Sequence, residues 1–220
     1  MKILNAVVSS VLVLTMAFSL SGCRVSEAKF SPSGLSKYAN SQGAECYDDP
    51  DEWCHDLENV NGDITFIEDG VYFYAKKDVV KDTLKGWEVT EGFYSVTINE
   101  ATIYIVGDYS EKDDTSSVGY AISLSYNNGV SAEKFYKQHT VALEVDAKSN
   151  PDAECDVFKD GSLQYFLYSE DVGYSHHVCG IYLQGNTVLL IFGVGDDENI
   201  ANKHVYDICE ALDLASPGDL

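Results

Sequence analysis

Basic residues are scarce in this sequence. Lys and Arg number 14 against 36 Asp and Glu, which gives a formal net charge of −22 at pH 7. A surface this acidic repels phosphate backbones and anionic lipid headgroups, so the composition argues against nucleic acid as a partner and against electrostatic binding to membranes. Hydrophobic residues still make up 45% of the chain, enough for a real core. The acidity is therefore a property of the surface and not a sign of disorder.

Motifs for catalysis are missing as well. The sequence has no GxSxG motif, no papain-like cysteine context and no CxxC pair for zinc. The glycines of "FGVGDDEN" precede Asp196, Asp197 and Glu198, whose charges would repel a phosphate and which suit helix capping instead. We expect no cofactor, and the absences favour binding over catalysis while leaving an enzyme as an alternative.

The first 22 residues have the pattern of an export signal, with Lys2 before an apolar run and small residues at its end. The motif Leu20-Ser21-Gly22-Cys23 resembles the lipobox of bacterial lipoproteins. That resemblance implies cleavage before Cys23 and acylation of its thiol by chains such as palmitate. An uncleaved membrane helix is the alternative, because the apolar run is almost long enough to span a bilayer.

Two or more acyl chains hold a protein durably on a membrane, and no segment after Cys23 is apolar enough to cross one. We therefore expect an extracytoplasmic protein of the bacterial cell envelope, anchored to the membrane through lipid. Its other partner is expected to be an unidentified protein or small ligand.

The chain is expected to divide into three parts after cleavage of residues 1–22. Residues 23–41 are rich in Ser, Gly, Ala and Lys, which predicts a flexible tether. Residues 42–214 are expected to form one domain, with a possible subdomain at 42–90, and residues 215–220 a tail.

Alternating apolar residues and turn signals predict strands in runs, joined by tight turns and interrupted by separate helices. Strands are expected at 63–76, at 89–109 with turns at 91–92 and 99–100, at 117–126, and in a meander over 154–194. Helices are expected at 49–62, at 78–85, from Ser131 onward, and at 198–212. The last strand of the meander is apolar on both faces. It should therefore lie in the middle of the sheet, with both of its faces covered by other parts of the chain. This pattern predicts an α+β fold with a mostly antiparallel sheet flanked by three or four helices.

In the order of its elements, the stretch 93–212 resembles Mog1- and PsbP-type folds. This resemblance implies strands, one helix, a meander and a terminal helix, and it carries no site residues.

Five cysteines follow Cys23, in a compartment where disulfides can persist. We expect Cys46 to pair with Cys54, because the two flank a local turn and helix start. A bond between Cys155 and Cys179 is the second choice. Cys209 is expected to be a free thiol, buried on the final helix.

The stretch "SHHVCG" brings together two histidines and a cysteine, residue types that can bind metal ions. On a strand, His176 and His177 point to opposite faces, whereas His177 and Cys179 share one. A zinc site would need two more ligands, such as Cys155 or Asp171, and a structural disulfide at Cys179 is the alternative.

A second weak metal candidate is the acidic segment 107–117, which contains Asp108, Glu111, Asp113 and Asp114. Carboxylates suit calcium, but the EF-hand spacing is absent and a solvated loop is the alternative. Two other functions therefore stand beside an envelope binding or accessory protein. One is an envelope hydrolase or metal-dependent enzyme whose residues, for example Cys179 and His204, meet only in the fold. The other is a calcium-responsive surface module.

Tyrosines at alternating positions are a further candidate feature. Tyr72, Tyr74 and Tyr104 could form an exposed aromatic platform for sugars or peptides, or could pack at the edge of the core.

Overall fold

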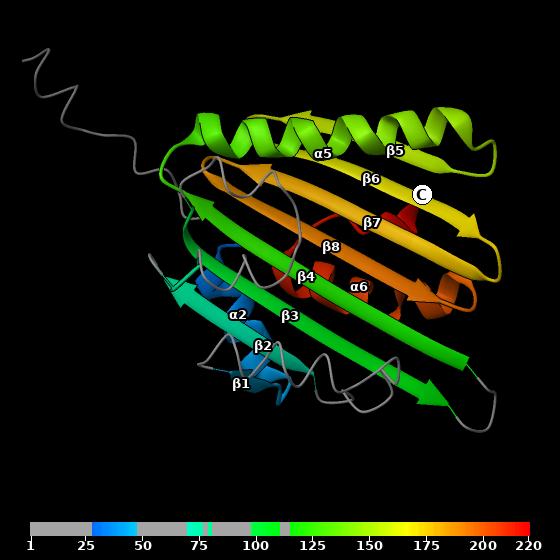
Figure 1. Ribbon diagram of the computed structural model, residues 1–220, viewed down its shortest axis with the longest axis horizontal. Coiled ribbons are helices and arrows are strands. Elements are labelled where there is room, and N and C mark those ends of the chain that lie inside the picture. Colours follow the sequence, from blue (N-terminus) through cyan, green and yellow to red (C-terminus); the bar gives the residue numbers. More distant parts are fainter. Residues whose placement is uncertain (1–27, 48–69, 77–78, 81–97, 111–114) are drawn as a thin grey trace, which may run out of the picture.

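The computed structural model describes residues 28–47, 70–76, 79–80, 98–110 and 115–220 (Figure 1). The leader and the expected lipidation site Cys23 lie outside these residues, as do the helix expected at 49–62 and Cys54. The strand expected at 63–68 and most of the helix expected at 78–85 also lie outside them.

The described strands form one 8-stranded sheet in the order β1-β2-β3-β4-β8-β7-β6-β5. Their bounds are β1 Glu45–Tyr47, β2 Val71–Lys76, β3 Ile98–Ser110, β4 Thr115–Tyr126, β5 Glu154–Asp160, β6 Leu163–Val172, β7 Ser175–Gln184 and β8 Thr187–Gly195. Every pairing is antiparallel except that of β1 with β2. This confirms the α+β fold with a mostly antiparallel sheet.

The meander forms as expected because its turns contain residues that permit positive φ. Gly161, Gly173 and Gly185 lie between successive strands from β5 to β8 with φ of 55°, 66° and 62°. Glycine reaches this region without the steric penalty that a Cβ imposes. The last strand of the meander, β8, lies between β4 and β7 as predicted.

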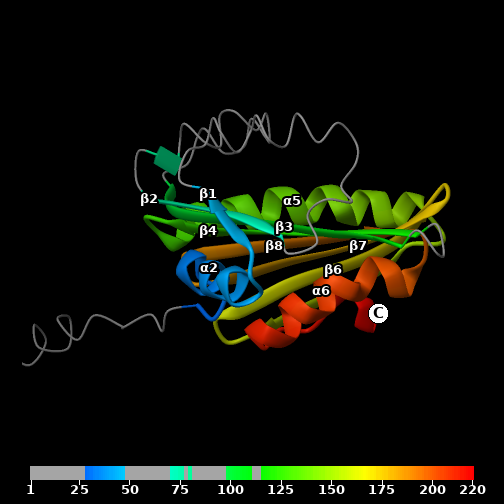
Figure 2. The ribbon, with the colours of Figure 1, turned by 90° about the horizontal axis from the view of Figure 1, so that it is seen from below.

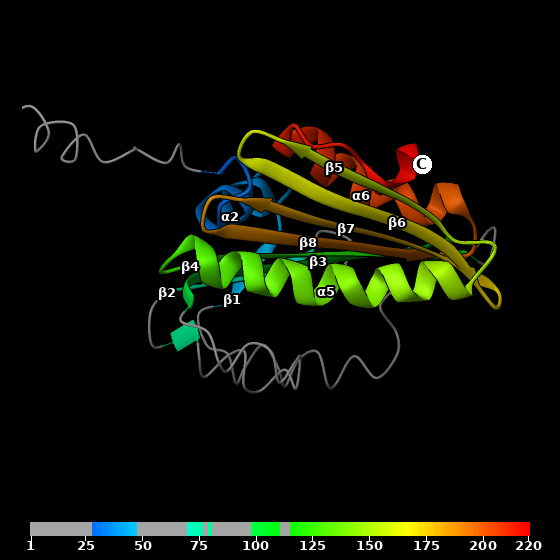
Figure 3. The same cartoon turned by 90° about the horizontal axis from the view of Figure 1, so that it is seen from above.

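Three α-helices cover the two faces of the sheet in the described part of the chain. Helix α5 (Gly129–Ser149) lies on one face, and α2 (Pro32–Ser41) and α6 (Glu198–Leu212) lie on the other (Figures 2 and 3). Asp197 caps α6 as predicted, accepting a hydrogen bond from the Ile200 amide at 3.0 Å. Helix α5 begins earlier than expected, because Asn128 is its cap and Ser131 donates to the Asn128 side chain.

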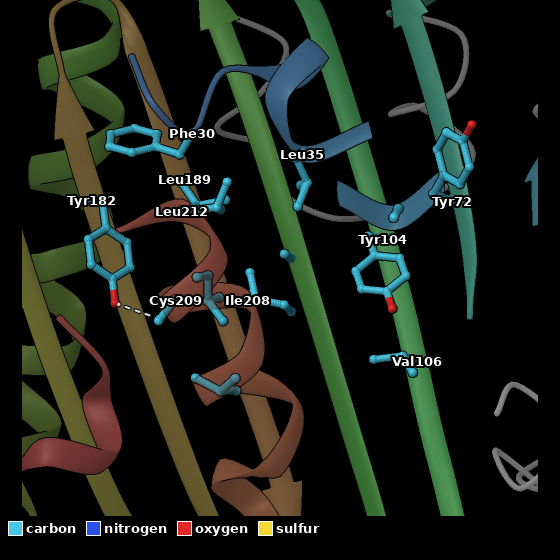
Figure 4. Close-up of a cluster of buried hydrophobic side chains, with 14 of the residues drawn as sticks. Phe30, Leu35, Tyr72, Tyr104, Val106, Tyr182, Leu189, Ile208, Cys209 and Leu212 are labelled. Atoms are coloured by element: carbon cyan, nitrogen blue, oxygen red, sulfur yellow. Dashed lines mark hydrogen bonds between the residues drawn. The ribbon is translucent and has the colours of Figure 1, made fainter. Parts of the chain in front are cut away.

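Each face of the sheet has its own hydrophobic core. Under α5, fully buried side chains include Phe135, Phe166, Ile181 and Leu124. The opposite core, drawn in Figure 4, is closed by α2 and α6. The sheet is therefore the middle layer of a three-layer body.

The expectation of a flexible tether up to residue 41 is wrong for its described part. Residues 32–41 form α2, and Phe30, Leu35 and Ala39 are fully buried. The Thr102 hydroxyl donates to the Pro32 carbonyl at 2.7 Å, and the Ser123 hydroxyl donates to that of Phe30 at 2.5 Å. Sequence periodicity is weak here because the helix has only 10 residues, fewer than three turns.

Two other boundaries also differ from expectation. The tail at 215–220 is packed: Ser216 and Pro217 are buried, and residues Pro217–Asp219 form the short helix η2. Strands β1 and β2 belong to the common sheet, so the described residues of 42–90 extend it and do not form a separate subdomain. The turn expected at 99–100 is instead an irregularity within β3, next to Ile98.

None of the helices that the structure describes is long and apolar enough to cross a membrane.

Candidate functional site

A pocket of about 220 Å³ opens between α5 and the sheet; we call it the α5 pocket. One helix and three adjacent strands provide its walls. Its lining residues are His139, Ala142 and Leu143 of α5, Tyr168 and Glu170 of β6, His177, Cys179 and Ile181 of β7, and Leu190 and Phe192 of β8.

Strand alternation and register bring these side chains together. Tyr168 pairs across the ladder with Cys179, and Glu170 pairs with His177. Residues two apart on a strand share a face, so both pairs face α5. This confirms the prediction that His177 and Cys179 share a face. The helix adds His139, which lies one turn after Phe135. The centroids of these two rings are 4.2 Å apart.

Two buried polar atoms of the pocket have no hydrogen bond of ordinary geometry. Tyr168 is only 3% exposed, and its hydroxyl faces the Glu170 carboxylate without making such a bond, while His139 Nε2 has no partner among the described residues. A buried polar group without a partner costs about 1–3 kcal/mol. Two such atoms in one pocket are the signature of a site that a polar group can enter.

Burial keeps both groups uncharged. It raises the pKa of Tyr168 above its ordinary value, and the nearby Glu170 carboxylate raises it further. Burial lowers the pKa of His139. Glu170 itself accepts a hydrogen bond from the Asn150 amide nitrogen at 2.9 Å. The pocket therefore contains the phenol of Tyr168 and the neutral imidazole of His139. It also contains the Glu170 carboxyl group, which accepts one hydrogen bond from Asn150.

Cys179 does not have the properties of a nucleophile. Burial raises the pKa of its thiol to about 12, so the reactive thiolate is rare at neutral pH. His177 is engaged elsewhere: its Nε2 lies 3.1 Å from the Ser175 hydroxyl, and its ring meets Phe192 edge-on at 5.5 Å. The arrangement favours ligand binding over thiol chemistry.

The additional zinc ligands considered for His177 and Cys179 lie elsewhere. Asp171 is on the opposite face of the sheet, where its carboxylate contacts His176 Nδ1 at 2.8 Å. Cys155 is exposed on the edge strand β5. The part of the chain that the structure describes has no group of three or more His, Cys, Asp or Glu that could hold a metal ion.

The acidic segment is described only in part. Asp108 lies on β3 with its carboxylate paired to Lys203 and 3.3 Å from His204 Nε2, in a second pocket of about 160 Å³. Glu111, Asp113 and Asp114 lie outside the described residues. Of the four carboxylates expected to bind calcium, the structure describes only Asp108, and this carboxylate is already paired with Lys203.

The disulfide expected between Cys155 and Cys179 is absent, and both thiols are free. Strand β6 runs between their strands, and Tyr168 is the ladder partner of both cysteines. Adjacent strands lie about 4.8 Å apart, so two strand spacings exceed the reach of a disulfide. Cys46 is free and exposed on β1, and its expected partner Cys54 lies outside the described residues. Cys209 is free and buried on α6, as predicted.

Two other proposed groupings do not form. Cys179 faces α5 and His204 faces the sheet from α6, so the sheet separates them. Tyr72 and Tyr104 are buried in the core under α2 and do not form an exposed platform, while Tyr74 is half-buried.

Sequence reasoning did not identify Tyr168, Glu170 and His139 as one site. The signal that could have found them is a polar or amphipathic residue on each inward face: Tyr168 and Glu170 alternate with Leu167 and Ser169, and His139 follows Phe135 at helical spacing. Comparisons with protein-family models, curated proteins and solved structures give no match for this chain.

Proposed function

We propose that this protein is a lipid-anchored, extracytoplasmic binding protein of the bacterial cell envelope that takes a small ligand in the α5 pocket. The anchor rests on the lipobox-like motif that ends at Cys23. The binding role rests on one observation: the Tyr168 hydroxyl and His139 Nε2 are buried without a hydrogen bond of ordinary geometry, among the described residues, in a pocket with apolar walls. Apolar walls with a few convergent polar groups are typical of ligand sites.

The position of the first packed residues adds a geometric consequence of lipidation. Ala28 and Phe30 are already buried in the body of the protein. A chain spans at most about 3.6 Å per residue, so the path from Cys23 to Ala28 reaches no more than about 18 Å. A lipid on Cys23 would hold the α2 side of the body close to the membrane surface. The folded body could then not move far from the membrane.

Cell fractionation of a Cys23→Ala variant tests the anchor. We expect the wild-type chain in the membrane fraction with a blocked, acylated N-terminus, and the variant in the soluble extracytoplasmic fraction. Unchanged membrane retention of the variant, or an unacylated wild-type N-terminus in mass spectra, would overturn the lipid anchor.

A pocket-blocking variant tests the binding role. Ala142 is exposed and lines the α5 pocket, so Ala142→Trp should fill the pocket without disturbing the core. Val145→Trp, at an exposed position on the same helix outside the lining, is the matched control. Ligand-observed NMR with indole, phenethyl alcohol and phenethylamine should show binding to wild type and Val145→Trp, and none to Ala142→Trp. Binding that survives in Ala142→Trp, or no binding of any probe to wild type, would refute the role of this pocket.

A further inference from the structure

The α5 pocket also restricts the chemistry of what can occupy it. Building on the proposed binding role, we infer that its ligand is a small primary ammonium carried on a compact apolar body, of the size of one aromatic ring. Three properties of the pocket lead to this: its volume, its set of hydrogen-bond acceptors and its charge.

The volume selects a compact ligand. A cavity of about 150 Å³ lined by aliphatic and aromatic side chains is known to take benzene, and the α5 pocket has about 220 Å³. This is below the about 300–1,000 Å³ of pockets that hold drug-sized molecules. Leu143, Ile181, Leu190 and Phe192 supply an apolar wall against which one ring can pack.

The polar groups of the pocket match the donors of an ammonium. An –NH3⁺ group has three donors and no acceptor. The Tyr168 hydroxyl, which faces Glu170, can accept one hydrogen bond from the ammonium. The Glu170 carboxylate can accept a second while it keeps its bond to Asn150. A neutral hydroxyl could satisfy only part of this set.

Charge selects against the alternatives. Among the described residues, Glu170 lines the pocket and no Lys or Arg does. The chain as a whole has a formal net charge of −22, which raises the local concentration of cations and lowers that of anions. An anionic ligand would meet repulsion at both levels, and an amino acid would bring an unpaired carboxylate of its own.

Isothermal titration calorimetry of the full-length protein tests the ligand class with three probes that share a phenethyl group. We expect phenethylamine to bind about tenfold more tightly than phenethyl alcohol, since a hydrogen bond to a charged group exceeds a neutral one by about 1 kcal/mol or more. The anion 3-phenylpropionate should bind weakest. Equal affinities for the amine and the alcohol, or tighter binding of the anion, would overturn the inference while leaving a pocket that binds small rings.

Two variants assign the preference to Glu170. Glu170→Gln removes the charge and keeps an oxygen for Asn150, so it should abolish the tenfold preference for the amine over the alcohol. Asp171→Asn removes one charge at the adjacent position on the other face of the sheet and should leave the preference intact. A preference that persists in Glu170→Gln, or that falls equally in both variants, would refute recognition of the ammonium by this carboxylate. The Ala142→Trp variant tests whether the site exists, because it should lose binding of all probes. The Glu170→Gln variant tests the ligand class, because it should lose only the preference for the amine.

Discussion

His204 Nε2 lies 3.3 Å from the Asp108 carboxylate, on the α6 side of the sheet and away from the α5 pocket. Asp108 is also paired with Lys203. The His204 backbone comes so close to β4 that a Cβ on Gly119 would meet the His204 Cβ at 2.6 Å. A titratable side chain is therefore fixed between a helix and the sheet, beside a carboxylate that already has a cationic partner.

We predict that His204 makes the fold sensitive to mild acid. Burial lowers its pKa below the ordinary value of 6.5, the Lys203 charge lowers it further, and Asp108 and Asp207 oppose the shift without reversing it. The unfolded chain then takes up a proton more readily than the folded one. The stabilising contribution is therefore complete above pH 6.5 and is lost as the pH falls from 6.5 through the folded pKa.

Chemical denaturation at pH 7.5 and pH 5 checks this expectation. The free energy of unfolding should decrease less between the two pH values in His204→Gln than in wild type. His139→Gln should behave in the same direction, because burial also lowers the pKa of His139. An identical pH dependence in wild type and His204→Gln would contradict the prediction.

The close approach of α6 to the sheet depends on glycines and gives a second prediction. Gly119 and Gly193 are ladder partners on β4 and β8. A Cβ at Gly193 would lie 2.2 Å from the Ala201 carbonyl oxygen, which is helix backbone and cannot rotate away. We expect Gly193→Ala to destabilise the protein by about 1–3 kcal/mol, as overpacking in a core does.

Thermal unfolding measures this effect. Val157→Ala, at an exposed position on the edge strand β5, should change stability by no more than about 0.5 kcal/mol. A Gly193→Ala protein as stable as wild type would show that α6 can shift away from β8 at little cost.

These glycines illustrate which parts of the fold the sequence predicts. The meander, the central place of β8 and the inward face of α6 follow from alternation, turn residues and helical spacing, all of which are local. The function of Gly119 is not local, because it depends on a helix that follows about 80 residues later in the chain. From the sequence alone, a glycine in a strand is equally consistent with a residue that destabilises the strand and with one that lets a helix pack closely on it.

The same limit explains the tether and the disulfide. Helix α2 has too few turns for a clear period, and its burial depends on a sheet built from later residues. The pairing of Cys155 with Cys179 depended on strand order, and β6 between them could not be placed from spacing alone. The α5 pocket was missed for the same reason, since Tyr168 and His139 become neighbours of one cavity only after α5 packs on β6 and β7.

The packed C-terminal residues give a third prediction. The Tyr182 hydroxyl donates to the Ala215 carbonyl at 2.6 Å. It also lies 3.5 Å from Cys209 Sγ (Figure 4). Tyr182→Phe keeps the ring and leaves the carbonyl without this donor. We expect a loss of about 1–2 kcal/mol in the free energy of unfolding and earlier carboxypeptidase cleavage at the C-terminus.

Tyr174→Phe is the matched control, because Tyr174 is 100% exposed in the turn after β6. It should leave both readouts unchanged. If Tyr182→Phe also left them unchanged, the hydrogen bond to Ala215 would not hold the C-terminal residues in place.

The described cysteines should react in an order set by exposure and thiol pKa. Cys155 is exposed at the sheet edge, whereas burial raises the pKa of Cys179 to about 12 and that of Cys209 to about 11. Iodoacetamide at pH 8 without reductant should therefore label Cys155 rapidly, and should label Cys179 and Cys209 only after denaturation. Peptide mass spectrometry reads out each site. A peptide pair joined through Cys155 and Cys179 would contradict the strand order itself, because β6 keeps these two thiols apart in the folded chain.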